Sequence, residues 1–287
     1  MILITGATGR VGGATSRALS ARNITHRILV RSPEKWSSEG STAELVAGDL
    51  TNPEDVAGAV AGVTAALLVT SNAPTQPEIE RTFATLAADA GVTHLVKVSS
   101  MEAAPDSTAA FPRQHFESEE HIRSLELDHT FLRPNFFMQN LLMYAGSIVN
   151  AGLFALPLGR ALTAPVDSRD VGAVAAQALA EPGHRNKSYD LTGPELVTFD
   201  DVATVMTEVL GRPVRFVDQT PEAFREVLSQ FLPPGWQLDG VCELFGEIAG
   251  GSLAHETDTV RDILGHPPIS VRQFVIDHAA AFSPTPG

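Results

Sequence analysis

Short apolar segments alternate with amphipathic segments along the first half of this chain. The apolar segments predict strands at 2–4, 26–30, 44–46, 65–69, 94–98 and 130–132. The segments between them carry apolar residues at helical spacing and predict helices at 9–21, from 53 onward, at 77–90 and at 112–125. Regular strand–helix alternation is typical of an α/β fold, so we expect a doubly wound parallel sheet with helices on both faces.

The pattern changes after residue 134. Residues 135–158 form a long apolar segment, a helix is predicted at 168–179, and residues 188–191 predict a strand. From residue 198 onward the pattern is mainly helical, with one short strand at 214–217. We therefore expect a sheet domain over residues 1–155, its sheet rejoined by 186–192, and a smaller, mainly helical lobe over 156–287 that binds substrate.

A glycine-rich segment joins the first strand to the first helix. Its sequence is Gly6-Ala7-Thr8-Gly9-Arg10-Val11-Gly12, with glycine at every third position. The first glycine allows a tight turn, the second lets the backbone approach a pyrophosphate, and the third lets helix and strand pack closely. The helix N-terminus then offers N–H groups to phosphate. This arrangement predicts dinucleotide binding by Gly6, Thr8, Gly9, Arg10, Val11 and Gly12.

The residue that follows the second strand selects between NAD(H) and NADP(H). Folds that bind NAD place an acidic residue there to hold the ribose 2′-hydroxyl. This chain has Arg31, with Lys35 close behind, and a guanidinium pairs well with a 2′-phosphate. We expect NADP(H) to be preferred, with NAD(H) possible. Asp49 and Leu50, after the third strand, are expected near the adenine, although Asp49 could serve only its turn.

Polar residues follow the remaining strands at the edge where doubly wound sheets bind ligands. The residues expected to line the cofactor there are Thr70, Ser71, Asn72, Ser99, Pro134, Asn135 and Phe136. Ser99 is also a candidate to hydrogen-bond substrate. The structural alternative for each of these residues is an ordinary strand-end turn or core packing.

Composition excludes several classes of function. The 287 residues carry a formal net charge of −14, which argues against binding to nucleic acid or to an anionic membrane surface. No apolar run reaches the roughly 18 residues of a membrane span. The first strand begins at the N-terminus, and Cys242 is the only cysteine, so we expect a cytoplasmic protein without disulfides. The histidines form no tight ligand group supported by cysteine, so no metal is expected.

Several motifs together resemble the NmrA-like family of atypical short-chain dehydrogenase/reductases over nearly the whole chain. They are the glycine segment, Val30-Arg31-Ser32-Pro33, Gly48-Asp49-Leu50, His115-Phe116-Glu117-Ser118-Glu119, Leu132-Arg133-Pro134-Asn135-Phe136-Phe137-Met138-Gln139-Asn140 and Leu191-Thr192-Gly193-Pro194. The resemblance implies a Rossmann domain, a small C-terminal substrate lobe and NAD(P)(H) between them. It leaves the activity open, because relatives include reductases of quinones, azo dyes and triphenylmethane dyes, tailoring enzymes and redox-sensing regulators.

The tyrosine acid of typical short-chain dehydrogenases is absent. Phe111 and His115 stand where the family's Tyr-x-x-x-Lys motif would place tyrosine and lysine, and Pro112 predicts that Phe111 is the helix cap. His115 could hydrogen-bond the nicotinamide ribose, relay a proton, or be only a helix-surface residue near Glu119. A quinone needs no acid during hydride transfer, because the reduced anion is stabilised.

We therefore expect an NAD(P)H-dependent oxidoreductase that reduces a quinone or another conjugated aromatic acceptor, as a monomer or homodimer. The residues expected to wall its substrate pocket are Phe136, Phe137, Met138 and Tyr144. Two alternatives stay open: a non-catalytic protein that senses NADP(H), and a tailoring oxidoreductase or oxygenase acting on an aromatic polyketide.

Overall fold

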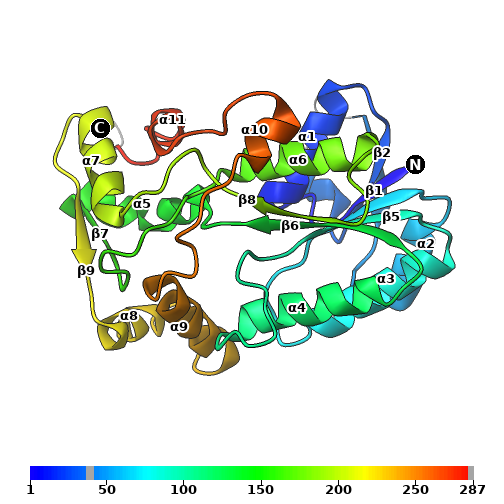
Figure 1. Cartoon of the computed structure of the whole chain (residues 1–287), viewed down its shortest axis with the longest axis horizontal. Helices are drawn as coiled ribbons and strands as arrows, with labels where there is room; N and C mark the ends of the chain where they lie inside the picture. The colour runs from blue at the N-terminus through cyan, green and yellow to red at the C-terminus, as the bar shows by residue number, and fades with distance from the viewer. Residues whose placement is uncertain (37–41, 284–287) are drawn as a thin grey trace.

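A single parallel sheet organises the first part of the chain (Figure 1). The computed structural model describes residues 1–36 and 42–283. Within them, seven parallel strands lie in the order β3-β2-β1-β4-β5-β6-β8. These strands are β1 (Ile2–Ile4), β2 (His26–Val30), β3 (Ala43–Ala47), β4 (Ala65–Leu68), β5 (His94–Val98), β6 (Asp128–Pro134) and β8 (Lys187–Leu191). The expected doubly wound α/β fold is confirmed, including the strand that rejoins the sheet.

Alternate residues of each strand pack against different helix layers. Leu67 and Val96 face a layer made of α1 (Arg10–Ala21) and α6 (Ser168–Ala180). Leu68 and Leu95, one position away, face a layer made of α2 (Pro53–Val60), α3 (Gln76–Asp89) and α4 (Ala110–Arg123). Because strand side chains alternate between faces, strands covered on both sides read as continuous apolar runs.

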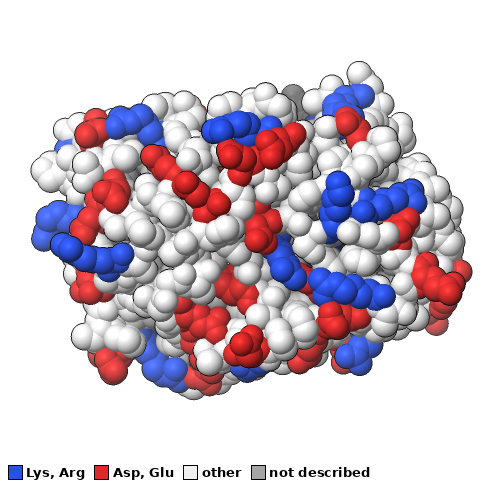
Figure 2. Space-filling model, in the orientation of Figure 1, with Lys and Arg blue, Asp and Glu red and all other residues white. Residues whose placement is uncertain are grey.

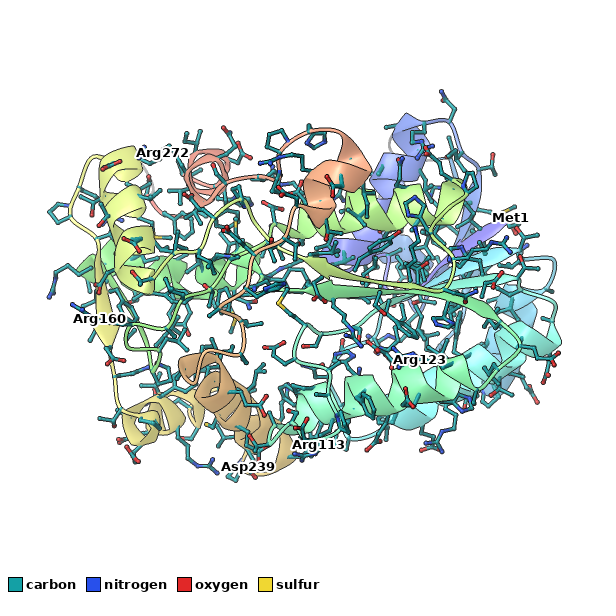
Figure 3. The ribbon with its side chains drawn as sticks, viewed as in Figure 1. Met1, Arg113, Arg123, Arg160, Asp239 and Arg272 are labelled. Carbon is teal, nitrogen blue, oxygen red and sulfur yellow. The ribbon has the colours of Figure 1, made fainter. Side chains whose placement is uncertain are left out.

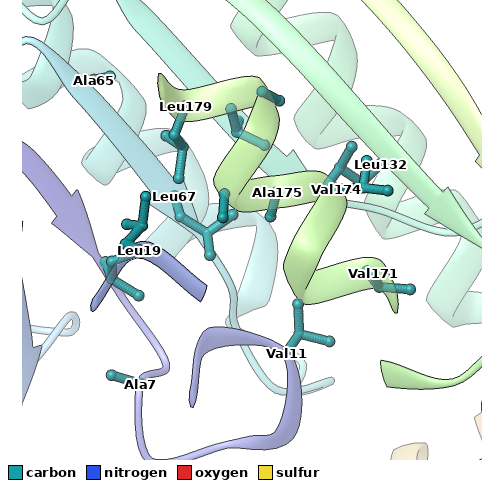
Figure 4. Packing of buried hydrophobic residues seen from close by; sticks show 14 of the residues in the cluster. Ala7, Val11, Leu19, Ala65, Leu67, Leu132, Val171, Val174, Ala175 and Leu179 are labelled. Atoms are coloured by element: carbon teal, nitrogen blue, oxygen red, sulfur yellow. The ribbon is translucent and has the colours of Figure 1, made fainter. Parts of the chain in front are cut away.

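The helices α1 and α6 pack closely on their face of the sheet. Figure 4 shows Val171, Val174 and Ala175 of α6 beside Leu67 and Leu132 of the sheet. A Cβ added at Gly172 would lie 2.4 Å from the Cβ of Ala14, so the two helices approach each other too closely for a larger residue. This contact fixes α1, and hence the turn that precedes it, against the sheet.

The helix after β5 begins earlier than predicted. Asn52 caps α2 by accepting a hydrogen bond from the Glu54 N–H at 3.1 Å. The placement of Phe111 at the cap of α4 is wrong, because Ala109 is the cap and the helix begins at Ala110. Pro112 is tolerated inside the first turn, where backbone N–H groups have no partner within the helix.

Side chains from the C-terminal lobe provide the missing cap of α4. The Ala109 and Ala110 N–H groups donate to carboxylates of Glu247 and Glu243, each at 3.1 Å. Both acids belong to α9 (Trp236–Ala249), more than 130 residues away along the chain. Figure 3 shows Arg113, near the start of α4, close to Asp239 on α9. The local sequence therefore holds no cap signal for this helix.

A second apolar cluster forms the C-terminal lobe. It gathers 3-10 helix η2 (Met138–Tyr144), α5 (Ala145–Ala151), β7 (Leu153–Leu156), α7 (Phe199–Leu210), β9 (Arg215–Asp218), α8 (Pro221–Leu228), α9 and α11 (Val271–Asp277). β7 and β9 pair in parallel as a separate two-stranded sheet. The two cores thus interleave along the chain: residues 136–156 pack in the lobe, whereas α6 and α10 (Thr259–Leu264) pack on the Rossmann sheet.

Candidate active site

The glycine turn brings the backbone of β1 close to the start of α1. Gly6 has φ of +61°, which L side chains rarely adopt, and its position leaves only 3.0 Å between an added Cβ and the Val69 side chain. A Cβ at Gly12 would lie 2.4 Å from the Gly6 carbonyl oxygen. Gly9 is the N-cap of α1 and provides no side-chain cap. The turn therefore presents an uncapped helix N-terminus beyond β1.

The loop residues divide into exposed and buried positions. Thr8, Gly9 and Arg10 are exposed at the tip, whereas Val11 and Gly12 are buried against the sheet. The exposed start of α1 and the Arg10 guanidinium can approach an anion from solvent. Helix N-termini with accessible N–H groups bind phosphate well.

The ends of β2 and β3 lie together at the same edge of the sheet. The Gly48 N–H donates to the Val30 carbonyl at 3.1 Å, so the residues that follow these strands are neighbours. Arg31 is exposed. The Thr51 backbone N–H, its hydroxyl and the nearby Arg31 guanidinium hold the pKa of Asp49 below its ordinary value, despite some desolvation. Leu50 is half-buried, and the Lys35 side chain lies outside what the structure describes.

A cavity of about 330 Å³ lies at the carboxyl ends of β4, β5 and β6, between the sheet and α9. We call it the inner cavity. It brings together nine of the residues selected from the sequence: Val11, Thr70, Asn72, Ser99, His115, Pro134, Asn135, Phe136 and Phe137. Its remaining lining comes from Val69, Val98, Ser100, Glu102, Phe111, Pro112, Asn140, Leu244, Phe245, Ile248 and Leu253.

Other selected residues lie elsewhere. Ser71 is exposed and does not line the inner cavity. Met138 is fully buried in the lobe core and does not reach the cavity wall. Tyr144 packs against Phe154 in the same core, where burial raises the pKa of its hydroxyl to about 12. Phe136 and Phe137 are thus the expected substrate-wall residues that the cavity includes.

Asn135 is already committed to structural hydrogen bonds. Its Nδ2 donates to the Leu253 carbonyl at 3.0 Å, and its Oδ1 accepts from the Phe136 N–H at 2.8 Å and from the Ala164 N–H at 3.2 Å. Its own N–H donates to the Leu191 carbonyl. The side chain therefore joins β6 to the C-terminal lobe and fixes the wall of the inner cavity.

The Ser99 hydroxyl is hydrogen-bonded to a charged network formed by Glu119 and Arg133. It donates to Glu119 Oε1 at 2.6 Å, and Glu119 also receives a fork from Arg133, with Nε to Oε1 at 3.0 Å. Burial alone would raise the pKa of Glu119, but the hydrogen bonds from Arg133 and Ser99 hold it below its ordinary value. The proton of the Ser99 hydroxyl thus points to Glu119, which leaves its oxygen to accept a hydrogen bond from the cavity side.

A buried ion pair supports His115. Lys97 Nζ lies 2.8 Å from Glu80 Oε2, and both side chains are fully buried. The same Nζ lies 3.1 Å from His115 Nδ1, and Gln76 Nε2 lies 3.3 Å from that nitrogen. Thr70 also donates to Glu80, at 2.5 Å. This network connects β4, α3, β5 and α4 directly beneath the inner cavity.

The network fixes the protonation state of His115. Burial, together with the Lys97 ammonium, lowers the pKa of His115 to about 3. Because Lys97 and Gln76 are donors, Nδ1 accepts and the proton of the neutral ring resides on Nε2. His115 is therefore an uncharged hydrogen-bond donor at neutral pH, and its ring does not titrate there. The alternative of a free helix-surface histidine does not describe this residue, because it is partly buried and bonded to Lys97.

Sequence reasoning missed Glu80, Lys97 and Glu102. Lys97 occupies the fourth position of a strand, between the apolar residues Val96 and Val98, and it is one of only three lysines in the chain. Its position was the available signal. Glu80 lies on α3 and Glu102 on the loop after β5, where acidic residues are ordinary surface residues in a sequence pattern. Their roles depend on contacts that no local pattern encodes.

Two further properties bear on ligand class. Figure 2 shows acidic side chains where α9 meets the start of α4. Among the residues described, none of the helices is long and apolar enough to cross a membrane, and no group of three or more His, Cys, Asp and Glu side chains is arranged to hold a metal ion.

Comparisons with known proteins agree with this architecture. The chain is 36% identical over 283 residues to an NAD(P)H azoreductase of Xenophilus azovorans, covering 98% of this chain and 99% of that protein. It is 39% identical over 289 residues to a (4-alkanoyl-5-oxo-2,5-dihydrofuran-3-yl)methyl phosphate reductase of Streptomyces griseus subsp. griseus, covering 99% of this chain and 100% of that protein.

A solved structure shows the same fold. The NADPH complex of the quinone oxidoreductase QOR2 from Escherichia coli superposes with a TM-score of 0.87, over 98% of this chain and 100% of that one, at 24% sequence identity. The family model described as "NmrA-like family" matches residues 1–264. With both the glycine turn and the interleaved lobe in place, the chain belongs to the NmrA-like family.

Proposed function

We propose that this protein is an NADP(H)-dependent oxidoreductase that reduces a quinone or another conjugated aromatic acceptor. One observation carries the proposal. The glycine turn of a dinucleotide site and an aromatic-walled cavity of about 330 Å³ open at the same edge of one sheet. Cavities of this size hold small organic ligands, and this edge is where doubly wound sheets bind them.

The residues present fit a dinucleotide. The close packing that Gly6 and Gly12 allow holds the turn against the sheet, and the uncapped N-terminus of α1 that follows suits a pyrophosphate. Arg31 is exposed at the end of β2 and is free to pair with a 2′-phosphate. Thr70, Ser99 and the Nε2–H of His115 would hold the nicotinamide end. The bound cofactor supplies hydride, and these side chains position it.

The polar groups of the cavity favour an acceptor that needs no strong proton donor during hydride transfer. Phe111 has no proton to donate, and His115 is already neutral. Reduction of a quinone by hydride gives a stabilised anion, whereas reduction of a simple ketone gives a strongly basic alkoxide. The wall of Phe136, Phe137 and Phe245 suits a flat, apolar ring system.

The charged residues that line the cavity indicate which net charge the acceptor carries. In the part of the chain that the structure describes, the residues that line it include Glu102 but neither lysine nor arginine. A phosphate ester, such as the substrate named for the Streptomyces relative, would find no cation in this cavity. An azo compound, such as the substrate class named for the Xenophilus relative, needs none. The cavity therefore supports an uncharged or cationic acceptor over an anionic one.

The test begins with fluorescence titration of the purified protein with NADPH and NADH. Quinones and azo compounds are then added as matched pairs, each with and without a sulfonate group. Tight NADPH binding with oxidation by the uncharged member of each pair is the expected result. Tight binding without oxidation across the whole panel would contradict the reductase proposal and favour a protein that senses NADP(H).

Cellular location and assembly are part of the same proposal. A cytoplasmic protein, monomeric or homodimeric, is consistent with use of NADPH and with a single cysteine, Cys242. Equilibrium sedimentation over a hundredfold concentration range distinguishes a monomer from a dimer. A higher oligomer would contradict this part of the proposal.

A further inference from the structure

The carboxyl group of Glu102 lies on the loop that follows β5. The chain turns back after this strand, with the Ala103 N–H donating to the Ser100 carbonyl at 3.1 Å. The turn directs Glu102 back toward the strand end, where its Oε2 lies 2.5 Å from the Ser100 hydroxyl oxygen. Ser100 and Glu102 both line the inner cavity. The pair is therefore adjacent to the space that the acceptor would occupy.

Glu102 also lines a second, open cavity of about 380 Å³ on the other side of the same loop. We call this the outer cavity. Its other lining residues are Ala104, Asp106, Ser107, Glu247, Gly250, Gly251 and Ser252. Among the described residues, Glu102 is the one that lines both cavities. Glu102 thus lies between a solvent-open surface and the apolar interior of the site.

The surroundings of Glu102 favour its protonated form. Burial raises the pKa of its carboxyl, the Ser100 hydrogen bond opposes this, and the negative charge of Glu247 on α9 raises it further. Asp106 faces the outer cavity from the same loop, and neutral His115 faces the inner cavity from α4. Among the residues that the structure describes, no lysine or arginine lines either cavity. A carboxyl group whose pKa is raised in this way keeps its proton more readily than an exposed carboxyl group and can serve as an acid.

We propose that Glu102 and Ser100 form a proton path that carries protons from the outer cavity to the reduced acceptor in the inner cavity. The proposal rests on the proposed reductase function and names the acid that replaces the absent tyrosine. Two cavities, one shared side chain and one short hydrogen bond carry it.

The step balances as follows. The acceptor gains a hydride, which is two electrons and one proton, and becomes an anion, while the dihydronicotinamide that supplies the hydride is oxidised to the positively charged nicotinamide ring. The acceptor anion then takes the hydroxyl proton of Ser100, and a bond forms between that proton and the acceptor. Ser100 regains a proton as the O–H bond of Glu102 breaks. The resulting Glu102 carboxylate is protonated by water in the outer cavity, so one solvent proton is consumed in each turnover.

The path matters most for acceptors that become strongly basic. Hydride addition to an azo bond leaves a nitrogen anion that must be protonated promptly, whereas the anion of a hydroquinone is stable enough to wait for water. Loss of a general acid typically slows such a step by about 10²–10⁴-fold. We expect Glu102→Gln to lower kcat for uncharged azo acceptors by about 10²-fold and kcat for simple quinones by less than about fivefold.

The experiment compares Glu102→Gln, Glu102→Asp and Asp106→Asn with the unsubstituted protein. Asp106→Asn is the matched control, because Asp106 lines the outer cavity alone. The azo rate of the unsubstituted protein should fall as pH rises through the pKa of Glu102, with a solvent deuterium isotope effect. Glu102→Gln should lose both properties, Glu102→Asp should keep the pH dependence at a lower rate, and Asp106→Asn should keep both.

A measurement without turnover complements the kinetics. The infrared difference spectrum between the unsubstituted protein and Glu102→Gln should contain a protonated carboxyl band that disappears as pH rises, whereas the Asp106→Asn difference should not. NADPH titration of both variants should give unchanged affinity. Equal azo and quinone losses, or a pH profile unchanged in Glu102→Gln, would overturn the proton path. If the unsubstituted protein oxidises NADPH with none of the acceptors tested, the reductase function is overturned instead, even if the carboxyl band is present.

Discussion

Lys97 Nζ lies 3.1 Å from His115 Nδ1, and this contact determines what His115 can do. A donor on Nδ1 leaves the proton on Nε2, and burial with the adjacent ammonium lowers the pKa of the ring to about 3. Histidine in this state resembles a fixed amide donor more than a titrating acid. Its expected task is to donate one hydrogen bond toward the nicotinamide end of the cofactor.

The first prediction concerns the charge of His115. Nitrogen NMR of histidine-labelled protein should show His115 neutral, with the proton on Nε2, from about pH 8 down to about pH 5. In the double variant Glu80→Gln/Lys97→Met the pKa of His115 should rise, because the ammonium that lowers it is gone. A ring that titrates near its ordinary value in the unsubstituted protein would contradict this account.

The second prediction concerns the buried pair Lys97–Glu80. Lys97→Met leaves an uncompensated buried carboxylate and should reduce the free energy of unfolding by about 3–5 kcal/mol. The double variant Glu80→Gln/Lys97→Met should recover part of this loss. Urea unfolding measures both. The control is the exposed pair Arg22–Glu181, where Arg22→Ala should cost less than about 1 kcal/mol.

The third prediction concerns the glycine turn. Gly12→Ala places a Cβ against the Gly6 carbonyl oxygen, so the turn must shift and NADPH affinity should fall more than about tenfold. Gly58→Ala on α2 is the control, because an added Cβ there meets nothing within 4 Å. It should leave NADPH affinity unchanged and stabilise the protein by about 0.5–1 kcal/mol. Fluorescence titration and urea unfolding provide the two readouts.

The fourth prediction concerns the choice between NADPH and NADH. A charge-assisted hydrogen bond contributes about 1.5–3 kcal/mol, so Arg31→Ala should weaken NADPH binding by about 10- to 150-fold. NADH binding should stay within about twofold, because it lacks the 2′-phosphate. Arg160→Ala, in the C-terminal lobe (Figure 3), should change neither affinity. An equal loss for both cofactors in Arg31→Ala would assign Arg31 a purely structural role.

The fifth prediction concerns acid stability. His94 is buried with its Nε2 2.8 Å from Thr130 Oγ1, and burial, with Arg185 nearby, lowers its pKa to about 4. Between about pH 6.5 and pH 4 the unfolded chain binds a proton at this position and the folded protein does not. The free energy of unfolding should therefore fall as pH falls through that window, with a slope from His94 of up to about 1.4 kcal/mol per pH unit.

Urea unfolding at several pH values tests the stability prediction. His94→Gln should remove the contribution of this residue to the slope, although its stability at pH 7 will be lower. His266→Asn, at an exposed histidine, should keep the slope. Equal slopes in the unsubstituted protein and His94→Gln would show that the acid sensitivity arises elsewhere.

The sheet was predictable because its signals are local. Residues 2–4 form a strand at the positions predicted, since strands covered on both faces are apolar throughout. The turn Gly6–Gly12 was predictable for a similar reason, because backbone conformation and close approach restrict those positions to glycine. Six of the seven residues chosen for following particular strands do line one cavity, because parallel strands end at the same edge.

Contacts between distant segments were not predictable. Ala109 offers no side-chain cap, so the start of α4 depends on Glu243 and Glu247 of α9. Met138 belongs to an apolar segment whose pattern gives no indication of which side chains face the cavity, and it lies in the lobe core. The cofactor residues Arg31, Asp49 and Leu50 lie at the expected edge of the sheet, and their contact with NADP(H) stays a prediction.

The sequence by itself determined the Rossmann sheet, its glycine turn and the absence of the tyrosine acid. Each of these follows from properties of single residues or of short, regular spacings. Only the tertiary structure decided that Lys97 and Glu80 pair beneath His115, that α9 closes the inner cavity, and that Glu102 lies between two cavities. The physical reason is that burial and electrostatic fields depend on which distant segments pack together, and a buried charge is stable only where another segment compensates it.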